Sequence, residues 1–421
     1  MSNHNDLKEV ALKLLAYCRF NDWAGYDPYD AVNSRLFAAL PFLNSRLPRL
    51  VFTQALKRTP FNIRRLLLIP KTQNPKAIAL FLSAFLKLSR FGMPEVTDYP
   101  DLMIERLIAL RSQDPPYWCW GYSFPWQTRT IVVPAGTPNL VCTTFVAGAL
   151  LDAYEQRGEK RCLNMAVSTA QYILDELYWS MGTSIAGFSY PLPNLRTQVH
   201  NANFLASALL CRVYKHTGES KFLAPALRVA RYAATKQRKD GSWFYGEGPS
   251  QGWIDNFHTG YNLCALQSID NSLESTEFEP HIQRGLQFYR AHFFREDGAP
   301  RYFHNRDYPI DIHCVAQSII TLVLLRDLSP SNIPLASSVL EWALDHMWDK
   351  GGFFYYQVQR FYTVRIPYMR WAQAWMLLAI SSLLCDSGDV VANSKASRLD
   401  SLSSRMLTAS GAFGGPAFLT V

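Results

Sequence analysis

The chain has 421 residues, of which 48% are apolar and 18% charged, a composition that supports a large buried core and excludes a largely disordered protein. The formal charge is +8, but no block of five or six like charges occurs, so we expect no nucleic-acid partner. The N-terminus lacks the pattern of a signal peptide, and the apolar stretches are too short to span a bilayer. We therefore expect a cytoplasmic protein without stable membrane insertion.

The first predicted helix of the main domain begins near Pro75, because proline is well tolerated in a first helical turn. Residues 1–60 are predicted to form an N-terminal helical extension, in which no chemical motif is visible. We expect the main domain to cover residues 61–390. A C-terminal helix and tail are predicted over residues 391–421.

An aromatic run follows between residues 117 and 129, where six aromatic side chains fall within ten positions. Such a run suits either a core β-ribbon or a platform on which sugar rings stack. We favour the platform. Trp118 and Trp120 are then the stacking residues, and Arg129 is a candidate partner for a substrate carboxylate.

Two segments in the middle of the chain repeat each other. The segment that starts at Tyr154 matches the segment that starts at Tyr214, 60 residues later, in its glycine, glutamate, leucine, alanine and tyrosine positions. The pattern predicts a helix that ends at Gly158 or Gly218, a short turn, and a second helix that begins beside a glutamate.

Loops that combine glycine or proline with aromatic residues recur near residues 187, 241, 298 and 352, and each precedes a helix rich in alanine, leucine and cysteine. The predicted starts of these apolar helices are Leu140, Val199, Ile254, Ile310 and Ile366, together with the earlier one near Pro75.

Six apolar helices, each paired with a more amphipathic one, predict an all-α (α/α)6 toroid with short aromatic β-hairpin loops at one mouth. An open α-solenoid is the alternative, although its repeats are usually shorter and lack aromatic loops.

The loops that enter the inner helices would converge at that mouth, so polar residues at the helix starts are the candidate site. His200 and Asn201 stand at one start, and Trp243, Tyr245 and Trp253 lie in the loop before the next. We interpret these five residues as candidates for substrate binding, with Tyr245 also a candidate acid or base.

Two consecutive helix starts carry the same residue types. Asp255 and His258 recur one repeat later as Asp311 and His313. Paired carboxylates on adjacent helices suit glycoside hydrolysis, whereas paired histidines and tyrosines suit proton abstraction and return. Tyr302 is the further tyrosine candidate, and spacing alone leaves both chemistries open.

Four further polar side chains are candidate substrate-binding residues. Arg365 and Arg370 flank the last helix start, where a cation is unfavourable because it opposes the helix dipole. We therefore expect each arginine either to bind a ligand or to pair with a carboxylate elsewhere in the chain. Tyr368 lies between them, and Arg301 precedes Tyr302. No nucleotide, zinc or other cofactor motif is present, so we expect no cofactor and no metal site.

The segment from Asp240 to Tyr261, with its sequence Trp253-Ile-Asp-Asn-Phe-His258, resembles bacterial polysaccharide-biosynthesis proteins of the VpsJ type. It is also distantly similar to the helical C-terminal domain of glucuronyl C5-epimerases, although the acid of that domain's aromatic motif is shifted here to Glu247. The resemblance implies a carbohydrate-active protein of capsule or exopolysaccharide synthesis and transfers no catalytic residue.

These patterns together predict an enzyme that binds an anionic, uronate-containing polysaccharide and abstracts the proton beside its carboxylate, as a C5-epimerase or lyase. Arg365 or Arg370 would neutralise the carboxylate. A glycoside hydrolase that uses Asp255 and Asp311, and a non-catalytic glycan-binding assembly protein, are the two alternatives.

Overall fold

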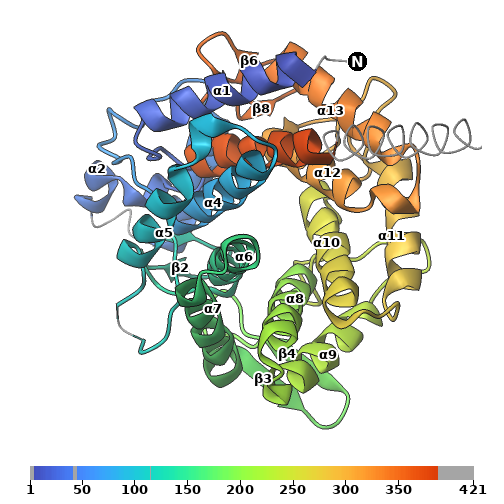
Figure 1. Cartoon of the computed structure of the whole chain (residues 1–421). Coiled ribbons are helices and arrows are strands. Elements are labelled where there is room, and N and C mark those ends of the chain that lie inside the picture. Colours follow the sequence, from blue (N-terminus) through green and yellow to red (C-terminus); the bar gives the residue numbers. More distant parts are fainter. Residues whose placement is uncertain (1–3, 41–44, 114, 387–421) are drawn as a thin grey trace, which may run out of the picture.

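A computed structural model describes residues 4–40, 45–113 and 115–386. Its helices form two concentric rings (Figure 1). The inner ring consists of α4 (Pro75–Arg90), α6 (Leu140–Arg157), α8 (His200–Thr217), α10 (Asn256–Leu273), α12 (Ile312–Leu324) and a helix that begins with the π-helical η6 (Met369–Ala374) and continues over residues 375–386. The outer ring consists of α5 (Tyr99–Ala109), α7 (Lys160–Tyr172), α9 (Ser220–Ala234), α11 (Glu279–His292), α13 (Asn332–Met347) and α1 (His4–Phe20).

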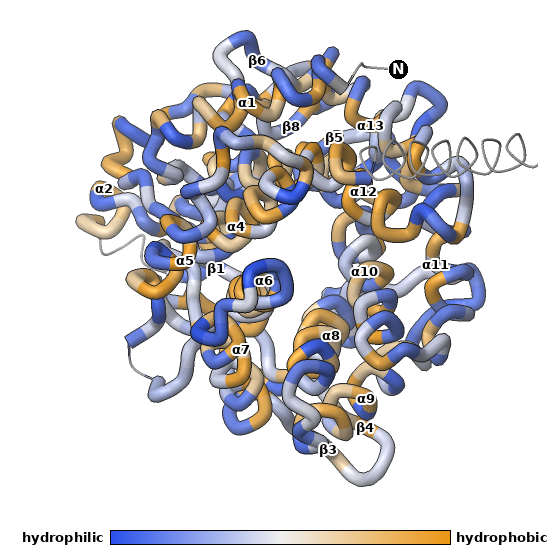
Figure 2. Tube along the Cα trace, in the orientation of Figure 1, coloured by the Kyte–Doolittle hydropathy of each residue, from blue (hydrophilic) through white to orange (hydrophobic). Residues whose placement is uncertain are grey.

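The ring is closed. Each inner helix contacts the next one, and η6 returns to α4. Inner and outer helices pair in chain order from α4 and α5 to α12 and α13, and α1 packs beside the last inner helix. The predicted (α/α)6 toroid is thus confirmed, and the open solenoid does not describe this chain. Figure 2 shows apolar stretches along helices of both rings, whereas many connecting loops are hydrophilic.

Local capping explains where the inner helices begin. The side chains of Asn74, Asn139, Asp255 and Asp311 each accept a hydrogen bond from a backbone N–H in the first turn of the helix that follows. The helix ends follow the predicted pattern as well: Gly158 and Gly218 adopt left-handed conformations directly after α6 and α8.

Some of the glycine loops contact the backbone of the next outer helix. Gly298 and Gly352 have φ values of +86° and +83°, which favour glycine, and a side chain at either would collide with a backbone carbonyl. The carbonyl facing Gly298 belongs to Ser338 of α13, and the one facing Gly352 belongs to Lys13 of α1. Because the same contact recurs at α1, this helix holds the sixth outer position.

Short antiparallel strands connect the rings. β3 (Tyr178–Met181) pairs with β4 (Ile185–Phe188), β6 (Trp348–Asp349) with β7 (Phe353–Phe354), and β1 (Trp126–Gln127) with β2 (Val132–Val133). β8 (Gln357–Val358) lies between β5 (Ile310–Asp311) and β9 (Thr363–Val364). These strands include several of the predicted aromatic hairpins, and they lead into the inner helices.

The N-terminal segment also reaches the mouth of the ring. The short helices η1 (Ala31–Asn33) and α2 (Arg35–Ala38) are followed by α3 (Arg46–Arg58), which contacts η1 and β1. The proposed boundaries at residues 60 and 390 stay predictions, and the expected C-terminal helix and tail lie outside the described residues. None of the described helices is both long and apolar enough to cross a membrane.

Candidate functional site

A cavity of about 500 Å³ opens at the end of the ring where the inner helices begin. We call it the central cavity. Its walls come from the first turns of all six inner helices, from the aromatic run after residue 117, and from the N-terminal segment. Because the N-termini of the inner helices converge here, their dipoles favour negative charge in this cavity.

His258 and Asp255 form a hydrogen-bonded pair in its wall. The Asp255 carboxylate lies 2.7 Å from Nδ1 of His258, and the Trp253 indole donates to the same carboxylate at 2.9 Å. Asp255 also caps α10 through the backbone N–H of His258. Since Nδ1 is engaged, Nε2 is the ring nitrogen through which His258 can exchange a proton with a ligand.

A second pair lies deeper in the cavity. The Tyr261 hydroxyl and Nε2 of His313 are 2.6 Å apart, and His313 is buried between the rings of Phe257 and Trp371. Burial, together with the positive charges of Lys76 and Arg370, holds the pKa of His313 well below its ordinary value. The imidazole is therefore neutral at neutral pH.

Aromatic rings form the rest of the wall. Tyr245 stacks on Trp253 with ring centroids 4.4 Å apart and lies 4.7 Å from the His258 ring. Tyr302 faces the cavity from the loop before α12, and the Arg129 guanidinium lies 4.3 Å above the Trp253 ring. Flat apolar faces beside polar groups are typical of sugar-binding sites.

Arg370 is buried in an ion pair. Its guanidinium contacts both oxygens of Asp27, at 2.7 and 2.8 Å, and both side chains are at most 5% exposed. Arg370 was interpreted either as a ligand clamp or as the partner of a distant carboxylate. The structure shows the second arrangement, with Asp27 as the carboxylate. A neighbouring buried pair, Arg64 with Asp30 at 2.8 Å, fixes the same N-terminal segment.

Of the predicted residues, the structure brings nine to the central cavity: Asn201, Tyr245, Trp253, Asp255, His258, Tyr302, His313, Arg129 and Arg370. Eight others lie away from its lining: Asp311, Trp118, Trp120, His200, Trp243, Arg301, Arg365 and Tyr368.

Each of these eight has another environment. Asp311 is fully buried and accepts hydrogen bonds from Trp371 and Gln357, and its pKa is raised to about 6 by burial. The indoles of Trp120 and Trp243 donate to backbone carbonyls in the core.

The remaining five are packed or paired elsewhere. Trp118 lies under the Arg111 guanidinium, and Arg301 pairs with Asp307. Arg365 packs over the Tyr355 ring. His200 is buried, with a pKa lowered to about 4 by burial. Tyr368 is fully buried beneath Arg64.

Several lining residues were not predicted. Tyr29 and Lys57 come from the N-terminal segment. Tyr122, Phe124 and Trp126 belong to the aromatic run that was predicted as a stacking platform, but they were not singled out within it as Trp118 and Trp120 were. Aromatic residues occupy every second position from Trp118 to Trp126, so the spacing does not distinguish the aromatic side chains that face a ligand from those that face the core.

Lys76 and Tyr261 left a fainter signal in the sequence. Lys76 is the single charged residue among positions 75–86, and Tyr261 follows His258 at the helical spacing of three.

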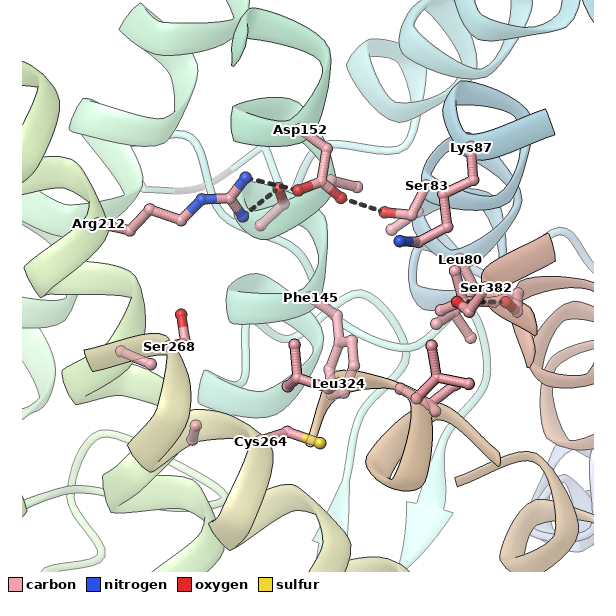
Figure 3. Close-up of a pocket in the computed structure, with 18 of the residues that line it drawn as sticks. Leu80, Ser83, Lys87, Phe145, Asp152, Arg212, Cys264, Ser268, Leu324 and Ser382 are labelled. Carbon is pink, nitrogen blue, oxygen red and sulfur yellow. Dashed lines mark hydrogen bonds and ion pairs between the residues drawn. The ribbon is translucent and has the colours of Figure 1, made fainter. Parts of the chain in front are cut away.

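A second cavity, of about 450 Å³, lies where the inner helices end; we call it the opposite cavity (Figure 3). Ser83, Asp152 and Arg212 are linked across it by hydrogen bonds of 2.6 Å. The Phe145 side chain lines this cavity and also contacts Tyr261 of the central cavity, with ring centroids 5.6 Å apart. Phe145 therefore lies in the floor between the two cavities.

Within the described residues, no group of three or more histidine, cysteine, aspartate or glutamate side chains is placed to hold a metal ion. The chemistry that the central cavity itself offers is proton transfer by His258 and by the phenol groups, beside a set of basic side chains.

The chain matches no known protein-family profile and no curated protein sequence. Its fold is similar to that of solved carbohydrate enzymes. Cellobiose 2-epimerase from Bacillus thermoamylovorans aligns with a TM-score of 0.58 and 12% identity, over 76% of this chain and 90% of that one. A GH76 α-mannanase from Bacteroides thetaiotaomicron gives 0.57 and 10%, over 75% and 87%. An unsaturated glucuronyl hydrolase specific for heparin gives 0.51 and 12%, over 75% and 87%. At these identities the similarity establishes the toroid fold.

Proposed function

We propose that this chain is a carbohydrate-active enzyme that moves the proton at the sugar carbon beside a uronate carboxylate, as a C5-epimerase or lyase of capsule or exopolysaccharide synthesis. The observation that carries the proposal is the His258–Asp255 pair in the wall of a cavity rich in basic side chains. The basic lining residues are Lys57, Arg58, Lys76, Arg129 and Arg370. Asp255 is the single carboxylate residue among the described lining residues.

The chemistry follows from this arrangement. His258 accepts the C5 proton through Nε2, while Asp255 holds the imidazole in orientation and stabilises the imidazolium that forms. The electron pair of the broken C–H bond moves into the carboxylate, whose enediolate charge the surrounding cations stabilise. In epimerisation, a phenol on the other face, such as that of Tyr302, returns a proton to C5. In elimination, the same electron pair forms the C4=C5 double bond as the C4–O bond breaks, and a phenol such as that of Tyr302 protonates the departing glycosidic oxygen.

A sugar 2-epimerase or isomerase is the second candidate, because the fold is similar to that of cellobiose 2-epimerase and of a D-mannose isomerase. The same histidine would then act at C2 of an open-chain aldose. The hydrolase alternative has less support: Asp255 is bonded to Trp253 and His258, and Asp311 is fully buried. Neither carboxylate is free to attack or to activate water.

The test is incubation in heavy water with glucuronate oligosaccharides and, separately, with cellobiose. Deuterium at C5 supports the epimerase, and a new ultraviolet absorbance supports the lyase. Deuterium at C2 of cellobiose supports the second candidate, and new reducing ends alone support a hydrolase. Binding without any of these products would refute the catalytic proposal in favour of a non-catalytic glycan-binding protein.

A further inference from the structure

Lys76 is a buried amine without an anionic partner. It occupies the second position of α4, its side chain is 3% exposed, and it lines the floor of the central cavity. Among the described residues, Nζ has no ion pair and no hydrogen bond. A lysine this deeply buried is almost always paired with an acid, so its environment requires an explanation.

Aromatic faces surround the amine instead of carboxylates. Nζ lies 4.0 Å from the ring centre of Phe145, 5.2 Å from Trp375 and 5.4 Å from Tyr261. Such faces attract a cation only modestly. The positive end of the α4 dipole opposes a charge at this position. A negative group that entered the cavity would therefore be the missing counter-ion.

We propose that Lys76 binds the carboxylate of the substrate at the floor of the central cavity, so that the ligand supplies the counter-ion that the protein does not. This inference rests on the proposed function, since it names the subsite for the uronate group. The Tyr261 ring is near both this subsite and the proposed base: its centre lies 6.0 Å from that of the His258 ring and 5.4 Å from Nζ of Lys76. Lys76 and His258 both line the central cavity, so one ligand could contact both.

The other cations of the cavity already have partners in the protein. Arg370 is bound by Asp27, and Nζ of Lys57 donates to the Tyr29 hydroxyl at 2.9 Å. Arg129 donates to a backbone carbonyl at the rim and is exposed. Arg58 is exposed and donates to the backbone carbonyl of Gln54 at 3.4 Å. Lys76 differs from these four because it is buried and its amine makes no hydrogen bond or ion pair among the described residues.

The same surroundings couple ligand binding to protonation of the Lys76 amine. Burial lowers the pKa of Lys76 well below its ordinary value, and the nearby Arg370 lowers it further, while the Cys142 thiol and Asp27 act weakly in the opposite direction. His313, on α12, is a neutral neighbour that carries no compensating charge. A bound carboxylate raises the pKa of the amine, so binding is accompanied by proton uptake wherever the empty site is incompletely protonated.

The experiment is isothermal titration calorimetry at pH 8 in phosphate and in Tris, whose ionisation enthalpies differ. The ligands are a glucuronate oligosaccharide and the same oligosaccharide after reduction of its carboxyl groups. For the wild type we expect proton uptake with the acidic ligand and none with the reduced one. Lys76→Met should lose about 10- to 100-fold in affinity for the acidic ligand alone.

Lys76→Arg is the decisive variant, because arginine stays charged: it should bind the acidic ligand without proton uptake. Lys71→Met, which removes an exposed lysine bonded to Asn21, should behave as the wild type. Undiminished proton uptake in Lys76→Arg, unchanged affinity in Lys76→Met, or no binding of the acidic ligand to the wild type would overturn the inference.

The two proposals fail separately. Lys76-dependent binding without deuterium exchange at C5 would refute the chemistry and keep the carboxylate subsite. Exchange at C5 that Lys76→Met leaves unchanged would refute the subsite and keep the chemistry.

Discussion

The Asp27–Arg370 ion pair ties the N-terminal segment to the last inner helix, across 343 positions of the chain. Asp27→Asn removes the negative charge and leaves the guanidinium of Arg370 buried without compensation. Breaking a buried pair on one side costs about 3–5 kcal/mol of unfolding free energy, because the remaining charge stays desolvated. We expect a loss of that size, since both bonds are short and both side chains are almost fully buried.

The chain provides a matched control. Asp22 pairs with Arg106 at 2.7 Å, the same distance as the shorter Asp27 bond, but the Asp22 side chain is 69% exposed. Asp22→Asn should therefore cost less than about 1 kcal/mol. The bond length and the residue types are the same in the two pairs, whereas the burial of the carboxylate differs.

Urea unfolding followed by tryptophan fluorescence measures both variants. The double variant Asp27→Leu/Arg370→Met should recover much of the loss, because no lone charge remains in the interior. Equal midpoints for Asp27→Asn and Asp22→Asn would refute the reasoning. A double variant at least as unstable as Asp27→Asn would refute it as well.

Three further predictions follow from single contacts. Asp255→Asn should keep the helix cap, and hence a nearly unchanged melting temperature, but lose at least about 100-fold in deuterium exchange at C5, because it cannot stabilise the imidazolium. Asp311, whose folded pKa of about 6 exceeds its unfolded value, holds its proton more tightly when folded. The free energy of unfolding should therefore fall by about 3 kcal/mol as pH rises from about 4 to 6. Urea titrations at several pH values should show that this free energy depends less steeply on pH in Asp311→Asn. Gly352→Ala should lower the melting temperature more than Gly92→Ala, because both have positive φ but only Gly352 faces a backbone carbonyl.

The fold was predictable because its signals are local. A glycine cap, a following glutamate and an apolar helix recur at fixed spacing, and each acts within one or two turns of its own position. The predicted starts near Pro75 and Leu140 coincide with those of α4 and α6. The four later ones precede the observed helices by one to three residues, because the chain is extended through a capping or connecting residue before the first turn.

The candidate site was predictable only where it follows the repeat. Asp255 and His258 reach the cavity, but their counterpart Asp311 turns inward, because Trp371 and Gln357 bind its carboxylate in the core. Those partners lie 60 and 46 residues away, beyond the reach of a local pattern. The contribution of Asp27 depends in the same way on how the ring closes.

The direction of the inner helices gives the two ends of the ring opposite electrostatic character. All six begin at the central cavity, so their positive dipole ends and the amine of Lys76 face one space. All six end at the opposite cavity, where Lys87 and Arg212 lie near the negative ends (Figure 3). Cations at that end offset the dipoles and need no ligand, whereas Lys76, when it is protonated, adds to a field that is already positive. Negative charge is therefore favoured at the central cavity by the direction of the helices as well as by the side chains.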